Sequence, residues 1–268
     1  MNYIINYKAD TNFQSLKNEH ACLDIDIFEK ALSETHLIIN KITKDIPIDV
    51  FSILGMRNLS AFIGELFARS LANMSNEMFI SNPHQDGYPD LLLMNAGGKA
   101  AFEKLKINGS LKEKSPFSPF EYGGIEIKAT CGSVPTPKEC AKKGLEKPDM
   151  GDTRISLVKA YDWKAHHRET NNLIGIFWDF LDRTPHIMAV FFGNELSKDD
   201  WGEIVKPKDN GGRTTSVSII TPNGVKKMYS NWILVKNDSR YIDFFNKKNN
   251  GNLMIFQQNI GCSRISDE

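Results

Sequence analysis

The heptapeptide GIEIKAT, residues 124–130, has the β-branched composition of a strand buried in a sheet, yet it carries a carboxylate and an ammonium group two residues apart. Side chains alternate along a strand, so Glu126 and Lys128 point to one face while Ile125 and Ile127 point to the other. The apolar face can pack beneath a helix. The charged face must look into a cleft, because burying unpaired charges in an apolar core is unfavourable.

The segments around this strand predict an α/β (α+β) fold, in which helices flank a central mixed β-sheet. Apolar residues at helical spacing indicate helices over residues 24–44, 57–73 and 155–168. Strands are expected at residues 77–81, at DLLLMN (90–95), which ends in a Gly97-Gly98 turn, and at the apolar runs NLIGIFWDFL (172–181) and HIMAVFFGN (186–194). The segment TTSVSIITPNGVKKMYSNWILV predicts a C-terminal β-hairpin around an Asn223-Gly224 turn.

The composition describes a globular protein without a global charge bias. The chain has 268 residues, 41% of them hydrophobic, and its formal net charge is zero, so any attraction to phosphate must be local. Residues 1–50 hold five Lys and Arg against eight Asp and Glu, whereas residues 205–248 hold nine against three. No internal repeat or flexible linker is evident, so we expect a single domain over residues 1–268.

The sequence predicts a cytoplasmic protein. It has no basic segment followed by an apolar one at its start, and no run approaches the ~20 apolar residues of a membrane span. The four cysteines are scattered without CxxC pairs or histidines at zinc spacing, so neither a structural zinc nor a disulfide framework is expected. GGK at residues 97–99 lacks the other residues of a phosphate-binding loop, which argues against an NTPase.

A second carboxylate is expected beside Glu126. Asp90 follows Pro89 and opens the predicted strand DLLLMN, and proline is tolerated at the start of a strand. If this strand pairs with GIEIKAT, the two carboxylates converge on one point. Hard oxygen ligands with room for water suit Mg²⁺, one or two ions per site. Lys128 beside them can orient or deprotonate a water, or stabilise charge on a phosphate, which is the chemistry of metal-assisted phosphodiester hydrolysis.

The dipeptide PD at residues 89–90 and the tripeptide EIK at residues 126–128 together resemble the PD-(D/E)xK motif of a nuclease superfamily. The resemblance implies a mixed sheet flanked by helices, a divalent-metal site and DNA cleavage. By the same resemblance Asp90 and Glu126 are metal ligands, and the main-chain carbonyl of Ile127 is a further ligand.

Members of this superfamily often carry one more acidic residue on the helix before the motif, and Glu65 in the segment IGELFARSL has the matching place. The resemblance therefore implies that Glu65 assists the site. A simpler interpretation is a surface ion pair with Arg69, four residues later on the same helix. Both interpretations are open from the sequence.

The whole chain resembles a type II restriction endonuclease more than a minimal resolvase. On this reading the catalytic core covers about residues 57–193, an insert at about residues 131–153 contacts DNA, and the C-terminal hairpin region covers about residues 205–248. The expected activity is Mg²⁺-dependent, sequence-specific cleavage of double-stranded DNA that leaves 5′-phosphates. Cutting both strands of a palindrome requires two sites, so we expect a homodimer. The alternatives are a structure-directed repair or recombination nuclease, or a non-catalytic DNA-binding protein on the same scaffold.

Residues that can reach bases or phosphates follow the predicted core strand. Arg pairs with guanine and Asn with adenine in favoured geometries, although any one such residue more often contacts phosphate. The adjacent histidines 166 and 167 would diverge by about 100° on a helix and not share a metal. Asp179 is expected to be a buried, hydrogen-bonded residue of its strand. The candidate DNA contacts are Arg154, Lys164, His167, Arg168, Asn171, Asn172 and Arg213.

Overall fold

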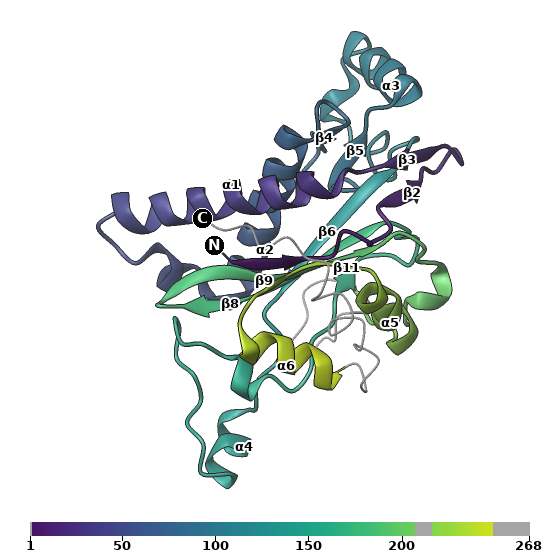
Figure 1. The fold of residues 1–268 in the computed structure, drawn as a ribbon. Coiled ribbons are helices and arrows are strands. Elements are labelled where there is room, and N and C mark those ends of the chain that lie inside the picture. Colours follow the sequence, from purple (N-terminus) through teal and green to yellow (C-terminus); the bar gives the residue numbers. More distant parts are fainter. Residues whose placement is uncertain (1, 207–215, 249–268) are drawn as a thin grey trace.

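A seven-stranded mixed β-sheet runs through the centre of the molecule (Figure 1). The computed structural model describes residues 2–206 and 216–248. In spatial order the sheet comprises β1 (Tyr3–Ile5), β11 (Trp232–Lys236), β9 (Thr184–Gly193), β8 (Leu173–Leu181), β6 (Gly124–Thr130), β5 (Leu91–Leu93) and β4 (Phe79–Ser81). Neighbouring strands are antiparallel, except that β6 and β8 run parallel. Two ribbons lie outside this sheet: β2 (Asn12–Gln14) with β3 (His20–Cys22), and β7 (Lys164–Ala165) with β10 (Ser218–Ile219).

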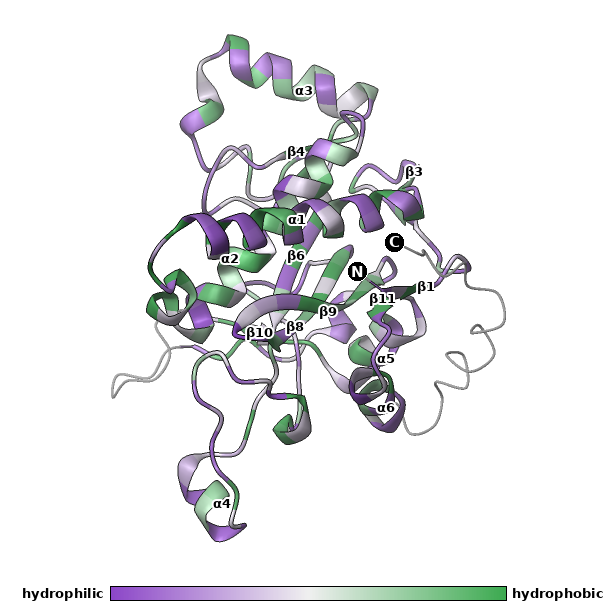
Figure 2. Cartoon of the chain, turned by 60° about the vertical axis from the view of Figure 1, so that its left-hand side comes forward, coloured by the Kyte–Doolittle hydropathy of each residue, from purple (hydrophilic) through white to green (hydrophobic). Residues whose placement is uncertain are grey.

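Helices α1 (Ile25–Asp45) and α2 (Val50–Met74) cover one face of this sheet. The side chain of Asp24 caps α1 by accepting the N–H of Asp26 at 3.1 Å. Figure 2 shows hydrophobic and hydrophilic stretches alternating along α1, as expected of a helix with one buried face. Both helices were predicted, and α2 begins earlier than expected because it continues across a kink at Gly55.

Helices α5 (Pro222–Ser230) and α6 (Ser239–Lys248) lie on the opposite face of the sheet. The central strand β8 serves both cores, because Ile174, Ile176 and Trp178 pack with α1 and α2, whereas Phe177 packs with α5 and α6. A strand covered on both faces needs apolar residues at successive positions. The predicted strands at residues 172–181 and 186–194 and the mixed sheet flanked by helices are therefore confirmed.

Two helical excursions leave opposite ends of the strand that carries Glu126. Helix α3 (Ala96–Ile107) lies between β5 and β6, and the short helix α4 (Pro137–Lys142) follows β6. Figures 1 and 2 both show α3 and α4 projecting at opposite ends of the molecule. Three short 3₁₀ turns complete the described chain: η1 (Ser110–Lys112), η2 (Ile155–Leu157) and η3 (Lys198–Asp200).

The helix predicted over residues 155–168 is wrong. Only Ile155–Leu157 is helical, as a 3₁₀ turn, and the chain then extends into β7. Trp163 and Ala165 are buried in the α5–α6 core while Lys164 between them is exposed, so the pattern here has the period of a strand.

The hairpin predicted around Asn223 and Gly224 is also wrong, because this segment forms α5. Thr221 caps the helix by accepting the N–H of Gly224 at 3.3 Å, and Pro222 takes the first helical position. The flanking strands β10 and β11 pair with other strands rather than with each other.

The Gly97-Gly98 turn is the third wrong assignment, since both glycines lie in the first turn of α3. Asn95 caps this helix by accepting the N–H of Gly98 at 2.8 Å. At Asn95 and at Thr221 alike, a capping residue followed by glycine was interpreted as part of a turn, although such residues also start helices.

Within the described residues α2 is the one helix whose length and hydropathy match a membrane span. Its residues Leu59, Ile63 and Phe67 are fully buried against α1 and the sheet, and Arg57 and Glu65 lie on its other side, along a cleft. The apolar composition of α2 is therefore accounted for by core packing, which is compatible with a soluble protein.

Candidate active site

A close approach of two strands brings the candidate residues together. Leu91 of β5 is paired with Ile125 of β6. A Cβ atom on Gly124 would lie 1.9 Å from the carbonyl oxygen of Leu91, and Gly124 has a φ of 150°. Only glycine fits this position without displacing the backbone, and the resulting register places Asp90 beside Glu126.

Asp90 and Glu126 are fastened to each other's strands. The N–H of Ile127 donates to Oδ2 of Asp90 at 2.7 Å, and the N–H of Asp90 donates to Oε2 of Glu126 at 3.3 Å. Each carboxylate thus uses one oxygen to accept a main-chain hydrogen bond across the strand pair. The expected convergence of the two carboxylates, which depended on the pairing of these strands, is observed.

Lys128 lies between the two carboxylates. Its Nζ atom is 2.5 Å from Oε1 of Glu126 and 3.3 Å from Oδ2 of Asp90. On the other face of β6, Ile125 and Ile127 are buried in the core beneath α2, as the alternation predicted. The rigid apolar face therefore fixes the position of the charged face.

The charges of this cluster perturb one another. Burial, and next the carboxylate of Asp90, raise the pKa of Glu126 to about 7. Burial by itself would lower the pKa of Lys128, but the carboxylates of Glu126 and Asp90 outweigh it and raise that pKa above its ordinary value. Two carboxylates share one ammonium group here, so the cluster has an excess of negative charge that a further cation would relieve.

The cluster opens into a cleft of about 460 Å³ between α2 and the β7–β10 ribbon. Small residues on one face of α2, Ala61, Gly64 and Ala68, leave room for it, and Gly64 comes close to Ala129 of β6. The residues that line the cleft are Arg57, Ser60, Ala61, Gly64, Glu65, Ala68, Asp90, Ile127, Lys128, Ala129, Lys164, His166 and Val217.

Glu65 lies on the α2 wall of this cleft. Partial desolvation, and next the carboxylate of Asp90, raise the pKa of Glu65, although the residue remains open to solvent. No salt bridge joins Glu65 to Arg69 among the described residues, although the charge of Arg69 acts on Glu65 and lowers its pKa against the effect of burial. Glu65 is therefore placed at the site without being fixed to a partner.

The carboxylates of Asp90 and Glu126 fit a hard divalent cation. Oδ2 of Asp90 and Oε1 of Glu126 already converge on one cationic group, the Lys128 ammonium, and the adjoining cleft has room for water. No set of three His, Cys, Asp or Glu side chains arranged to hold a metal occurs within residues 2–206 and 216–248. The protein donors at this point are two carboxylates, to be completed by main-chain oxygen and water.

The candidate DNA contacts differ in their position and in how accessible their side chains are. Lys164 lines the cleft, and the ring of His167 packs edge-on against Tyr88 with 3.9 Å between the ring centroids. Arg168 holds the neighbouring loop, donating to Glu203 at 3.2 Å and to the Lys198 carbonyl at 3.1 Å.

The amide of Asn171 donates to the Gln14 carbonyl at 3.4 Å, and this side chain stays partly accessible. Arg154 and Asn172 are buried, and Asn172 donates to the carbonyls of Gln14 and Gly124. Little of either side chain is accessible in this structure, and their contact with DNA stays a prediction. Arg213 lies outside the described residues.

Three polar residues of the cleft were not predicted from the sequence: Arg57, Ser60 and His166. Arg57 lies eight residues before Glu65 on α2, so helical spacing from Glu65 was a signal that could have found it, whereas Ser60, five residues before Glu65, has no such spacing. His166 was examined only as half of a histidine pair on a helix. Because that helix does not form, its position in the cleft depends on the extended chain of residues 158–166.

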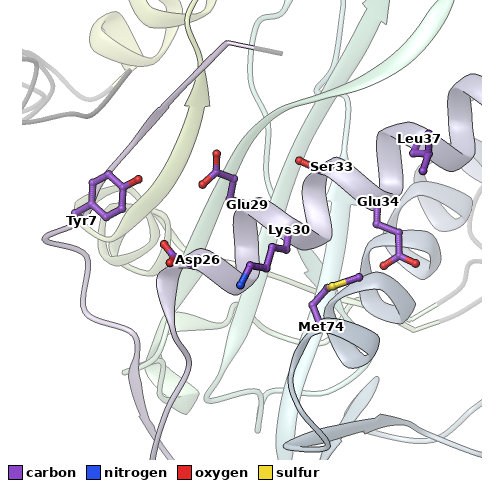
Figure 3. Close-up of a pocket in the computed structure, with 8 residues that line it drawn as sticks. All are labelled: Tyr7, Asp26, Glu29, Lys30, Ser33, Glu34, Leu37 and Met74. Carbon is purple, nitrogen blue, oxygen red and sulfur yellow. The ribbon is translucent and has the colours of Figure 1, made fainter. Parts of the chain in front are cut away.

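A cavity larger than this cleft lies elsewhere, along α1 (Figure 3). It measures about 1220 Å³ and is open to solvent. Figure 3 shows Asp26, Glu29, Lys30 and Glu34 projecting from α1 beside Tyr7 of the loop that follows β1. These side chains fan out along the helix rather than converge on one point, so the smaller cleft above Asp90 is the better candidate site.

Comparison with protein-family models, with curated proteins and with solved structures found no match to this chain.

Proposed function

We propose that this protein is a Mg²⁺-dependent endonuclease that hydrolyses phosphodiester bonds in double-stranded DNA, with a site of the PD-(D/E)xK type. One observation carries the proposal. Asp90 and Glu126, from adjacent strands, both contact Lys128, and Asp90 and Lys128 line a cleft. A buried Glu126 beside the half-buried Asp90, with one ammonium group between them, is unfavourable for stability alone, since unmatched buried charge is destabilising.

Asp90 and Glu126 would hold the metal, with the main-chain carbonyl of Ile127 as the further ligand that the motif implies. A bound Mg²⁺ supplies Lewis acidity toward a phosphate oxygen and lowers the pKa of a bound water. Lys128, held as an ammonium by the two carboxylates, stabilises negative charge on the phosphate rather than accepting a proton. Glu65 assists from the α2 wall.

Cations around the cleft support a polyanionic substrate. Arg57 and Lys164 line it from opposite elements, and no ion pair of Arg57 is found among the described residues. On α4 and at its C-cap, Lys138, Lys142 and Lys143 are exposed, which supports DNA contact by the insert at about residues 131–153. Such contacts are to phosphates and orient the duplex without reading its sequence.

We further propose a restriction role in the cytoplasm, with a homodimer cutting both strands to leave 5′-phosphates and 3′-hydroxyls. Two copies related by a two-fold axis would place one site on each strand of a palindrome. The motif resemblance and the size of the segments beyond the core support this class over a minimal repair nuclease.

Digestion of a sequenced plasmid with Mg²⁺, followed by mapping of the ends, tests the proposal. Discrete fragments with 5′-phosphates are expected, and a Glu126→Gln protein should give none. Cleavage confined to junctions or free ends would instead indicate a repair or recombination nuclease. DNA binding without cleavage at any Mg²⁺ or Mn²⁺ concentration would indicate a non-catalytic DNA-binding protein.

A further inference from the structure

His166 is an exposed residue on the β7–β10 side of the cleft, and one hydrogen bond orients its ring. Its Nδ1 atom lies 3.0 Å from the main-chain carbonyl oxygen of Ser216, in the segment leading into β10. A carbonyl oxygen can only accept, so Nδ1 carries the hydrogen of this bond. In the neutral ring the other nitrogen, Nε2, is then an unprotonated base.

The same side chain lines the cleft together with Asp90 and Lys128. Its neighbour His167 differs, since its ring packs against Tyr88 and its Nδ1 is 3.6 Å from Glu169. A base oriented by a hydrogen bond on its far nitrogen is the arrangement by which histidine serves in proton transfer.

The other basic groups in the cleft are poorly placed to accept a proton from water. Lys128 directs its ammonium at Glu126 and Asp90, which use its hydrogens, so it has no free lone pair in this arrangement. Arg57 and Lys164 are likewise donors. Among the described lining residues, His166 and the carboxylate of Glu65 are therefore the free side chains that can accept a proton.

We propose that His166 is a catalytic residue that acts as the general base of the hydrolysis; this inference rests on the proposed nuclease function. Nε2 takes one proton from the attacking water as the water oxygen bonds to phosphorus. The bond between phosphorus and the 3′ oxygen breaks, and that oxygen takes a proton from solvent to give the 3′-hydroxyl. The imidazolium then returns its proton to solvent, which restores the neutral ring.

Two variants separate the base from a structural role. His166→Asn keeps an N–H that can donate to the Ser216 carbonyl but has no basic nitrogen. His166→Ala removes the ring and leaves space that free imidazole can enter. His20→Gln, an exposed histidine on the β2–β3 ribbon, is the matched control. Thermal unfolding of each protein allows the rates to be expressed per folded molecule.

The measured quantity is the single-turnover rate of plasmid cleavage with Mg²⁺, with and without imidazole. We expect the Asn and Ala variants to lose roughly 100- to 10,000-fold in rate, the usual contribution of a general base. Imidazole should restore activity to the Ala variant and not to the Asn variant, and His20→Gln should cleave normally.

An Asn variant that cleaves at the unmodified rate would overturn the proposal, and so would an Ala variant whose lost activity imidazole does not restore. Either result would leave the nuclease function intact, because the unmodified protein still cleaves. Absence of cleavage by the unmodified protein would overturn both.

Discussion

Glu126 on β6 and Asp179 on β8 are both buried carboxylates, with 5% and 1% exposed, and they lie on adjacent parallel strands. Their partners differ. Asp179 accepts hydrogen bonds of 2.8–3.1 Å from neutral donors, namely the N–H groups of Arg154, Ile155 and Phe180 and the hydroxyl of Tyr241. Glu126 has one main-chain donor, the Lys128 ammonium and a second carboxylate beside it.

On the proposed function, the difference separates a structural carboxylate, Asp179, from a metal-binding one, Glu126. Asp179 ties β8 to the η2 turn and to α6, and all of its contacts favour the folded state, as expected for a hydrogen-bonded strand residue. Burial raises the pKa of both carboxyl groups, but at Glu126 the like charge of Asp90 opposes its negative charge as well. Burial alone therefore does not distinguish the two acids, whereas burial beside a like charge marks Glu126 as the candidate for function.

The largest expected effect is on activity. Glu126→Gln should lower the cleavage rate at least about 1,000-fold, or ~4 kcal/mol of transition-state stabilisation, because a ligand to the metal is lost. Asp179→Asn should cleave at nearly the parental rate per folded molecule. Plasmid cleavage with Mg²⁺ measures both, and equal losses in the two variants would break the distinction.

The second effect is on stability, and here the larger change is expected at Asp179 rather than at Glu126. Asp179→Ala leaves several buried donors without an acceptor and should lower the free energy of unfolding by about 3 kcal/mol. Glu126→Gln should not be destabilised to this extent. Urea unfolding followed by circular dichroism gives both values, and an Asp179→Ala protein as stable as the parent would contradict the structural role.

The third prediction concerns pH in the metal-free protein. Burial and Asp90 raise the pKa of Glu126 from the ordinary 4.5 to about 7, so the folded state binds this proton more tightly than the unfolded state. The resulting stability is complete below pH 4.5 and is lost as the pH rises through about 7. Glu126→Gln should remove this dependence and exceed the parent by roughly 1–3 kcal/mol near pH 8 in EDTA. Identical pH profiles of unfolding would refute it.

The smallest effect is expected at the rim of the cleft. Arg57→Gln should weaken DNA binding severalfold in Ca²⁺ and reduce the slope of log affinity against log salt by about one, since one phosphate contact is lost. Lys41→Gln on α1 removes the same charge from an exposed helical position away from the cleft and is the control. An unchanged slope for Arg57→Gln would remove Arg57 from the proposed DNA surface.

The strand β6 and its charged face were predictable from the sequence because they depend on the local alternation of apolar and charged side chains. The two-residue period over Ile125 to Lys128 is enough to assign the isoleucines to the core and the charged side chains to the opposite face. The position of Asp90 was predictable because the PD and EIK segments were taken together. The pairing register itself depends on the close approach of β5 and β6 at Gly124, which hydrophobic periodicity in the sequence does not indicate.

The remaining parts depended on tertiary packing. The segment at residues 155–168 has helical spacing at Ile155 and Val158, but Trp163 and Ala165 gain more by burial in the α5–α6 core. Arg154 was assigned to DNA from its charge alone, whereas its main chain is held by Asp179 and its side chain is buried. His166 lies at the cleft only because residues 158–166 are extended rather than helical.

Binding of Mn²⁺, measured by calorimetry without DNA, tests the central claim most directly. The account predicts that the parent and Asp179→Asn proteins bind the ion, and that Asp90→Asn and Glu126→Gln bind it at least tenfold more weakly. Unimpaired binding by Glu126→Gln, or no binding by the folded parent protein, would contradict the assignment of Asp90 and Glu126 as a metal site.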